Sequence, residues 1–160
     1  MAKKEKQGKL LIVDDNKSIL IALKLLLSSY FETVTTLNSP NNLLSTLREE
    51  NFDVVLLDMN FSAGVNNGNE GLYWLEQLHN AAPYVQVVLF TAYADIDLAV
   101  KGIKAGAADF VVKPWDNDRL VASLRNAYNL ARSAREVKQL KEIKRELASE
   151  QPMFWGESPA

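Results

Sequence analysis

The chain has 160 residues, which is enough for one domain with its own hydrophobic core and a short extension. Hydrophobic residues make up 48% of the sequence and charged residues 24%, and the net charge of −2 gives no overall basic field that would draw the protein to nucleic acid or acidic lipid. With no cysteine and one histidine, the sequence excludes disulfides, thiolate chemistry and a multi-histidine metal site.

The start of the chain is rich in charge and lacks the apolar segment of a secretory signal. We therefore expect residues 1–8 to form a solvated tail. No apolar run approaches the length of a membrane span, so we expect a cytoplasmic protein with no membrane contact.

Residues 10–132 alternate between short apolar or β-branched runs and segments with apolar residues at helical spacing. The runs predict five strands, at 10–13, 32–37, 53–57, 86–90 and 110–112. The spacing predicts helices at 17–29, from Ser39-Pro40 onward, at 70–80, at 95–105 and after Asp116. This alternation predicts an α/β fold with a doubly wound, five-stranded parallel sheet, flavodoxin-like with strand order 2-1-3-4-5.

The last predicted helix continues beyond the length that a compact domain needs. No helix breaker follows Asp116 until Pro152, and apolar residues fall at heptad-like intervals at Leu130, Val137, Leu140 and Leu147. We expect a domain at residues 9–132, followed at 133–151 by a helical, coiled-coil-like linker. Pairing of residues 116–149 between two copies predicts a homodimer.

Polar side chains stand at the carboxyl ends of four predicted strands. Asp14 and Asp15 follow the first strand and Asp58 the third, while Thr91 follows the fourth and Lys113 the fifth. Ligands bind outside the carboxyl ends of the strands in open α/β sheets, so we expect these side chains to converge. Taken singly, each aspartate could be a helix cap, and a threonine or a Lys-Pro pair is unremarkable. The complete set favours a functional site.

Carboxylates gathered in one cleft repel each other, and a hard divalent cation relieves the repulsion. We expect Mg²⁺ with Asp15 and Asp58 as direct ligands, Asp14 as a direct or water-mediated ligand, and the backbone carbonyl of Asn60 as a third protein ligand. Asp58 is then a nucleophile able to form an aspartyl-phosphate. The Lys113 ammonium would offset charge on the phosphoryl oxygens, and the Thr91 hydroxyl would donate to one of them.

Four stretches identify residues 9–132 as similar to a bacterial response-regulator receiver domain: LLIVDDNKSIL, DVVLLDMNF, VVLFTAYAD and GAADFVVKPW. The resemblance implies phosphoryl transfer to Asp58 from a sensor histidine kinase with Mg²⁺. It also implies a cis peptide bond between Lys113 and Pro114. In this family an aromatic residue three positions before the lysine reports the phosphorylated state together with the threonine, and here that residue is Phe110.

Three further features need a separate interpretation, and the first of them, Tyr93, stands at a position that varies in such a family. Tyr93 follows Thr91 by two residues, and we hypothesise that its ring shields the phosphoryl group from water. The Gly/Asn-rich loop after Asp58 lacks the Gly-Lys-Ser/Thr ending of a nucleotide site, which favours a flexible lid or kinase contact. His79 lies late on its predicted helix, away from the strand ends, and a packing or surface role is favoured over phosphorylation.

The final residues, FWGESPA, resemble the opening of the ATPase domain in sigma-54-dependent transcription activators, so residues 152–160 are expected to begin a missing downstream ATPase domain. A generic interdomain tail is the other interpretation. The sequence contains no GxxxxGK motif and no helix-turn-helix region, so we expect this piece neither to hydrolyse ATP nor to bind DNA specifically.

Two other functions remain open. A stand-alone receiver would pass its signal by docking a partner, which the linker and tail disfavour. A metal-dependent phosphatase of the aspartyl-phosphate type would need a second acid just after the nucleophile, and Met59 and Asn60 occupy those positions. We therefore expect a regulatory domain, limited to self-phosphorylation and self-dephosphorylation.

Overall fold

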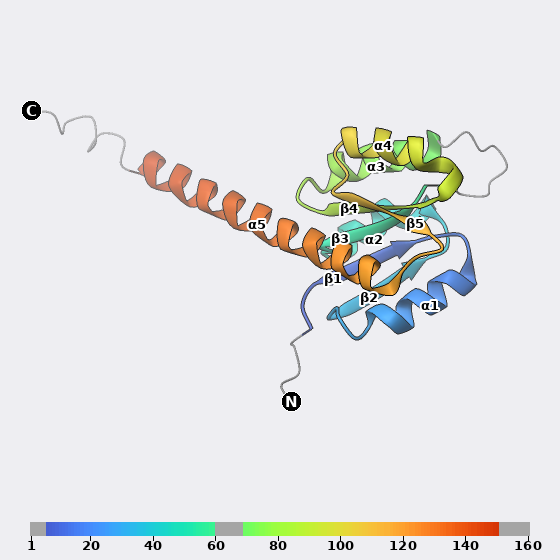
Figure 1. Ribbon diagram of the computed structural model, residues 1–160. Helices are drawn as coiled ribbons and strands as arrows, with labels where there is room; N and C mark the ends of the chain where they lie inside the picture. Colours follow the sequence, from blue (N-terminus) through green and yellow to red (C-terminus); the bar gives the residue numbers. More distant parts are fainter. Residues whose placement is uncertain (1–5, 60–68, 151–160) are drawn as a thin grey trace, which may run out of the picture.

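A computed structural model describes residues 6–59 and 69–150 of the chain (Figure 1). Its centre is a five-stranded, all-parallel sheet in the order β2-β1-β3-β4-β5. The strands are β1 (Lys9–Val13), β2 (Thr33–Leu37), β3 (Val54–Asp58), β4 (Gln86–Ala92) and β5 (Asp109–Lys113). The predicted fold class and strand order are confirmed.

Helices connect the strands as the sequence predicts. They are α1 (Lys17–Leu27), α2 (Leu43–Glu49), α3 (Asn69–Ala81), α4 (Ile96–Lys104) and α5 (Asn117–Glu150), with single turns of 3-10 helix before α2 (η1, Pro40–Asn42) and before α4 (η2, Tyr93–Asp95). Asn16 caps α1 by accepting the Ile19 N–H. Ser39 accepts the Asn41 N–H in the same way and opens η1 rather than α2 itself.

The alternation of side chains along the strands divides the core into two layers. One layer packs α1 and α5 against strand residues such as Ile12, Leu56 and Phe90. The other packs α2, α3 and α4 against Leu11, Leu57 and Leu89 on the opposite face. Figure 1 shows α3 and α4 together above the sheet, with α1 below it. Because both faces are covered, the strands read as continuous apolar runs.

Some element ends differ from those predicted. β4 continues to Ala92, so Thr91 lies inside the strand instead of after it. The helix expected at 95–105 begins one residue later, because residues 93–95 form the 3-10 turn. Gly8 is buried and does not belong to a solvated tail: its carbonyl accepts the Glu32 N–H at 2.9 Å, and its α-carbon lies against the Tyr128 ring.

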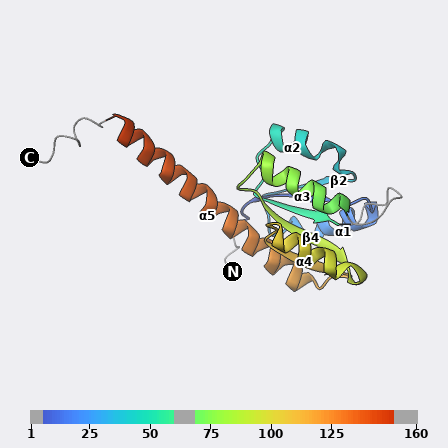
Figure 2. The ribbon, with the colours of Figure 1, turned by 90° about the horizontal axis from the view of Figure 1, so that it is seen from above.

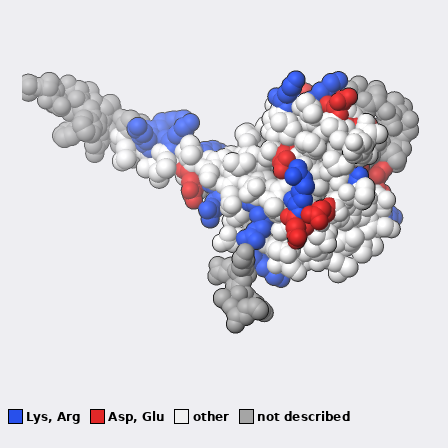
Figure 3. Space-filling view, in the orientation of Figure 1, with Lys and Arg blue, Asp and Glu red and all other residues white. Residues whose placement is uncertain are grey.

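Helix α5 is one uninterrupted helix whose first half is buried against the sheet through Leu120, Leu124 and Ala127. Its outer half projects from the body (Figures 1 and 2) and carries Lys and Arg side chains near its end (Figure 3). The apolar residues expected at heptad-like intervals, Leu130, Val137, Leu140 and Leu147, are exposed, and the outer half also exposes Ile143. Among the described residues, no helix is both long and apolar enough to cross a membrane.

Candidate functional site

Asp14 and Asp15 lie at the turn from β1 into α1. Asp14 is fully buried, and the turn holds its carboxylate in place because the Asn16 N–H donates to Asp14 Oδ1 at 2.9 Å. The Asp14 N–H in turn donates to the Leu37 carbonyl of the edge strand at 3.1 Å. Asn16 then caps the helix, so the chain leaves the sheet immediately after placing two carboxylates at its carboxyl edge.

Asp58 is the last residue of β3, the central strand, and is almost completely buried. It pairs in the sheet with Phe90 of β4, and the following Met59 N–H donates to the Phe90 carbonyl at 3.0 Å. Its backbone is therefore fixed by the ladder up to the residue that carries the carboxylate.

The sheet brings Asp14, Asp15 and Asp58 together, each offering a carboxylate oxygen within 4.8 Å of the others. Around one Mg²⁺ neighbouring oxygens lie about 3 Å apart and opposite oxygens about 4.2 Å apart, so the three carboxylates could share one ion after a small inward movement of their side chains. They are hard oxygen donors, which suits Mg²⁺ rather than a thiophilic metal. The residues present therefore fit the expected ion.

Lys113, the last residue of β5, reaches into this cluster. Its Nζ donates to Asp14 Oδ2 at 2.8 Å and to Asp58 Oδ1 at 3.1 Å, and it lies 4.8 Å from the centre of the Phe90 ring. Burial by itself lowers the pKa of Lys113, but the hydrogen bond to Asp14 and the charges of both carboxylates outweigh it, so the net pKa is raised. The peptide bond to Pro114 is cis, as the family resemblance implied.

Thr91 and Phe110, expected to report the phosphorylated state, and Tyr93, expected to shield the phosphoryl group, occupy different environments. Thr91 is fully buried one residue beyond the strand partner of Asp58, and its hydroxyl makes long contacts of 3.4 Å with the carbonyls of Ala92 and Asp95. Phe110 is half-buried against the α2, α3 and α4 side of the core. The Tyr93 ring is 78% exposed.

Several sequence-based expectations lie elsewhere. Asn60, the loop after it and the FWGESPA segment are outside the described residues. His79 is half-buried on α3 beside Gly106, and among the described residues its Nε2 has no hydrogen-bond partner. This position is apart from the carboxylate cluster and agrees with a packing role.

Two buried polar contacts were not anticipated from the sequence. Asp53, just before β3, forms an ion pair with Arg135 of α5. Asp109, at the start of β5, accepts the hydroxyl hydrogen of Ser123 in α5. The only sequence signal for either aspartate is an acid before an apolar run, which does not distinguish a structural carboxylate from a surface one.

A family model described as the response regulator receiver domain matches residues 10–125. The chain belongs to the response regulator receiver family. This receiver is 57% identical, with a TM-score of 0.71, to the crystal structure of the N-terminal signal receiver domain of a two-component system response regulator from Bacteroides fragilis, covering 77% of this chain and 98% of that one. Against NtrX from Brucella abortus the TM-score is 0.74 at 27% identity, with 84% of the receiver chain and 30% of NtrX covered.

Curated relatives of the receiver are transcriptional regulators by name. The alginate biosynthesis transcriptional regulatory protein AlgB of Pseudomonas putida is 39% identical over 116 residues, 72% of this chain and 25% of AlgB. The transcriptional regulatory protein ZraR of Escherichia coli is 34% identical over 118 residues, 74% of this chain and 26% of ZraR. The chain thus spans about a quarter of the length of these relatives.

Proposed function

We propose that this receiver accepts a phosphoryl group on Asp58 from a sensor histidine kinase, with Mg²⁺, and thereby controls a downstream sigma-54-type ATPase and transcription from within the cytoplasm. The observation that supports it most is the convergence of Asp14, Asp15, Asp58 and Lys113 at one edge of the sheet. The similarity to AlgB and ZraR supports a role in transcription regulation.

In this proposal an Asp58 carboxylate oxygen attacks the phosphorus of a phosphohistidine on the kinase. The phosphorus–nitrogen bond breaks, and the departing imidazole keeps the electron pair and takes a proton from solvent. Lys113 already lies between Asp14 and Asp58, so its ammonium is in place to offset charge on the phosphoryl oxygens. Mg²⁺ held by Asp14, Asp15, Asp58 and the Asn60 carbonyl would supply further charge compensation and orientation.

The phosphoryl group adds roughly −1.5 to −2 charges and three acceptor oxygens. With the residues that the structure describes, the Thr91 hydroxyl makes only long contacts, so turning toward the phosphoryl group would break no strong hydrogen bond among them. Phe110 would then move into the space behind β4. This change would repack α4, β5 and the start of α5.

The central experiment is incubation with Mg²⁺ and an acyl phosphate, read by intact mass. We expect a phosphate-sized adduct on the wild-type protein and none on Asp58→Asn. Asp53→Asn is the matched control, because Asp53 is also buried and flanks the same strand but lies at its other end. An adduct that survives Asp58→Asn, or one lost equally in Asp53→Asn, contradicts the assignment.

The output is proposed to leave through α5. The exposed side chains of Val137, Leu140, Ile143 and Leu147 form one apolar stripe on the outer helix, which a second copy of the helix would cover in a homodimer. Few turns project beyond the body, so the paired helix alone is expected to be weak. Deleting residues 133–160 should convert a dimer to a monomer in light-scattering measurements. An unchanged dimer would place the interface on the receiver body instead.

A further inference from the structure

Where the outer part of α5 begins to project, two of its side chains still contact the globular body of the receiver. The guanidinium of Arg135 forms an ion pair with Asp53, which lies 82 residues earlier in the sequence, just before the central strand β3. The Asp53 side chain is only 7% exposed, and its other oxygen accepts the Lys9 N–H at 2.8 Å. A buried carboxylate is costly without a partner, so this contact fixes a cation of α5 to the sheet.

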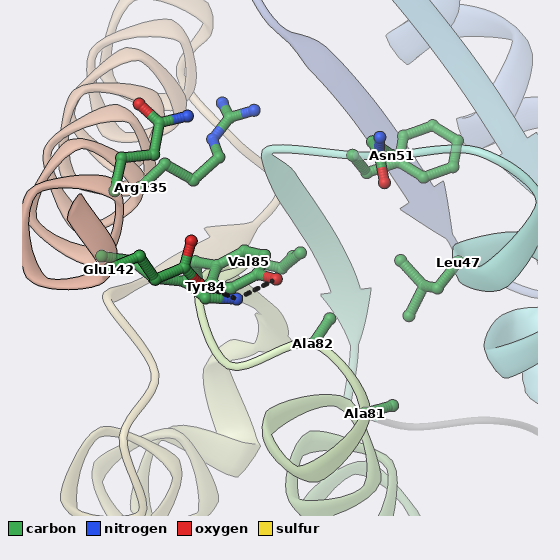
Figure 4. A pocket seen from close by; sticks show the side chains of 11 residues that line it. Leu47, Asn51, Ala81, Ala82, Tyr84, Val85, Arg135 and Glu142 are labelled. Carbon is green, nitrogen blue, oxygen red and sulfur yellow. Dashed lines mark hydrogen bonds and ion pairs between the residues drawn. The ribbon is translucent and has the colours of Figure 1, made fainter. Parts of the chain in front are cut away.

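A second contact lies one turn further along the helix. Lys138 Nζ donates to the Tyr84 hydroxyl at 3.0 Å and lies 4.5 Å from the centre of the Tyr84 ring. Figure 4 shows this hydrogen bond, with Arg135 and Glu142 on the α5 side and Leu47 and Ala82 on the side of the body. Between the two sides is a cavity of about 350 Å³. This part of α5 is therefore held to the body by the Arg135 and Lys138 contacts and is separated from it elsewhere by the cavity.

These contacts and the apolar stripe occupy opposite sides of the helix. At 3.6 residues per turn, Arg135, Lys138 and Glu142 fall within about 60° of one another. The stripe from Val137 to Leu147 is centred about 160° away from them. The side that faces the body therefore points the stripe outward, away from the receiver to which the helix belongs.

We propose that Arg135 and Lys138 are positioning residues that clamp the linker helix to the amino end of β3 and to the α3–β4 loop of its own receiver, and so set the direction in which the apolar stripe is presented. The importance of this clamp for signalling rests on the proposed pairing of the apolar stripe with that of a second copy of the chain. The clamp itself does not require that pairing.

Helix α5 is attached to the sheet at two points, so a relative movement of these points would change the direction of the helix. The helix is attached to β5 through Ser123 and Asp109, and to the amino end of β3 through Arg135. Asp58 ends the same strand that Asp53 precedes. About 18 Å of helix separates the two anchors, and about 22 Å projects from Arg135 to Glu150. Because these two lengths are similar, a shift of β5 relative to β3 would tilt α5 about Arg135 and move its outer end by a similar distance.

The test measures the direction of the outer helix inside a single chain. Because the sequence contains no cysteine, spin labels can be placed on Glu76→Cys in the body and Glu146→Cys in the helix without other changes. The labelled protein is mixed with an excess of unlabelled protein, so pulsed electron resonance reports intramolecular distances. A tilt of about 20° at Arg135 would move residue 146 by about 5–6 Å, which is well resolved.

We expect a narrow distance distribution in the otherwise unmutated chain, and a distribution at least twice as broad in the Arg135→Ala, Lys138→Ala pair. Arg135→Lys keeps the cation and should restore most of the narrow distribution. Arg132→Ala is the matched control, since it removes an exposed arginine of the same helix one turn earlier. Circular dichroism of each variant checks that α5 is still helical.

A distribution that is equally narrow without Arg135 and Lys138, or already broad with both of them, overturns the clamp. So does equal broadening by Arg132→Ala, because that would be a general loss of helix. A protein that is monomeric, but whose distance distribution is narrow with Arg135 and Lys138 and broad without them, would leave the clamp standing and refute the pairing instead.

Discussion

Replacing Asp58 by asparagine should stabilise this protein in the absence of metal, although the substituted residue is buried in the core of the domain. The carboxylate oxygens of Asp14, Asp15 and Asp58 lie within 4.8 Å of one another, and at an effective dielectric constant of about 20 each such pair repels by about 3.5 kcal/mol. Asp15 is half-exposed, so we halve its share. The repulsion on Asp58 is then about 5 kcal/mol.

The attraction to Lys113 at 3.1 Å is also about 5 kcal/mol on the same scale, so it cancels the repulsion. What remains is the cost of burying the charged carboxylate, several kcal/mol, against a weaker hydrogen bond from Lys113 to the asparagine oxygen. The net expectation for Asp58→Asn is a gain of about 2 kcal/mol in the free energy of unfolding. With a urea m-value of about 2 kcal/mol per molar, the midpoint rises by about 1 M.

The assay is urea unfolding in a chelating buffer, repeated with saturating Mg²⁺. Mg²⁺ should reduce the difference between the urea midpoints of Asp58→Asn and the wild-type protein. It stabilises the wild-type protein more, because the variant lacks one of the metal ligands. Asp53→Asn should instead lower the urea midpoint, because Asp53 pairs with Arg135 and lies outside the carboxylate cluster. If Asp58→Asn also lowers the midpoint without metal, the three carboxylates do not repel each other and the reasoning fails.

Three further predictions concern neighbouring positions. The raised pKa of Lys113 means that its contribution to stability is present below about pH 10.4 and is lost as pH rises through the folded value, so in metal-free buffer the difference in unfolding free energy between wild type and Lys113→Gln should shrink at alkaline pH. Gly106→Ala should lower the unfolding free energy by about 1–3 kcal/mol, because φ is +115° and a new Cβ would lie 2.8 Å from His79 Nε2; an unchanged urea midpoint would contradict this. Tyr93→Ala should shorten the lifetime of the phosphate adduct, followed by intact mass after the phosphodonor is removed, and an equal lifetime would refute shielding by the exposed ring.

The sequence predicted the sheet well because its strands are buried on both faces. Continuous apolar runs such as 10–13 and 53–57 give a strong local signal, and the observed strands start or end within a residue or two of them. The convergence of Asp14, Asp15 and Asp58 followed from the same signal, since the carboxyl ends of parallel strands meet at one edge. Their roles in phosphoryl transfer and metal binding stay predictions.

Local pattern was less informative where a partner lies far along the chain. Thr91 was placed after its strand because the apolar run ends at Phe90, yet pairing with β5 extends β4 to Ala92. Gly8 was assigned to a solvated tail because its neighbours are polar, but Tyr128 of α5 covers it. In both cases a distant element supplied the pairing or the burial.

In the receiver domain, the alternation of strands and helices, the residues at the strand ends and the length of the last helix can be predicted from the sequence alone. These follow from hydrophobic period and from helix breakers, which act over a few residues. The direction in which the last helix presents its apolar stripe depends instead on contacts between residues far apart in the sequence. Asp53 and Arg135 are 82 residues apart, and Tyr84 and Lys138 are 54 apart. Such pairs form only when the folded sheet has placed the amino ends of β3 and β4 beside α5, and they turn the apolar stripe outward.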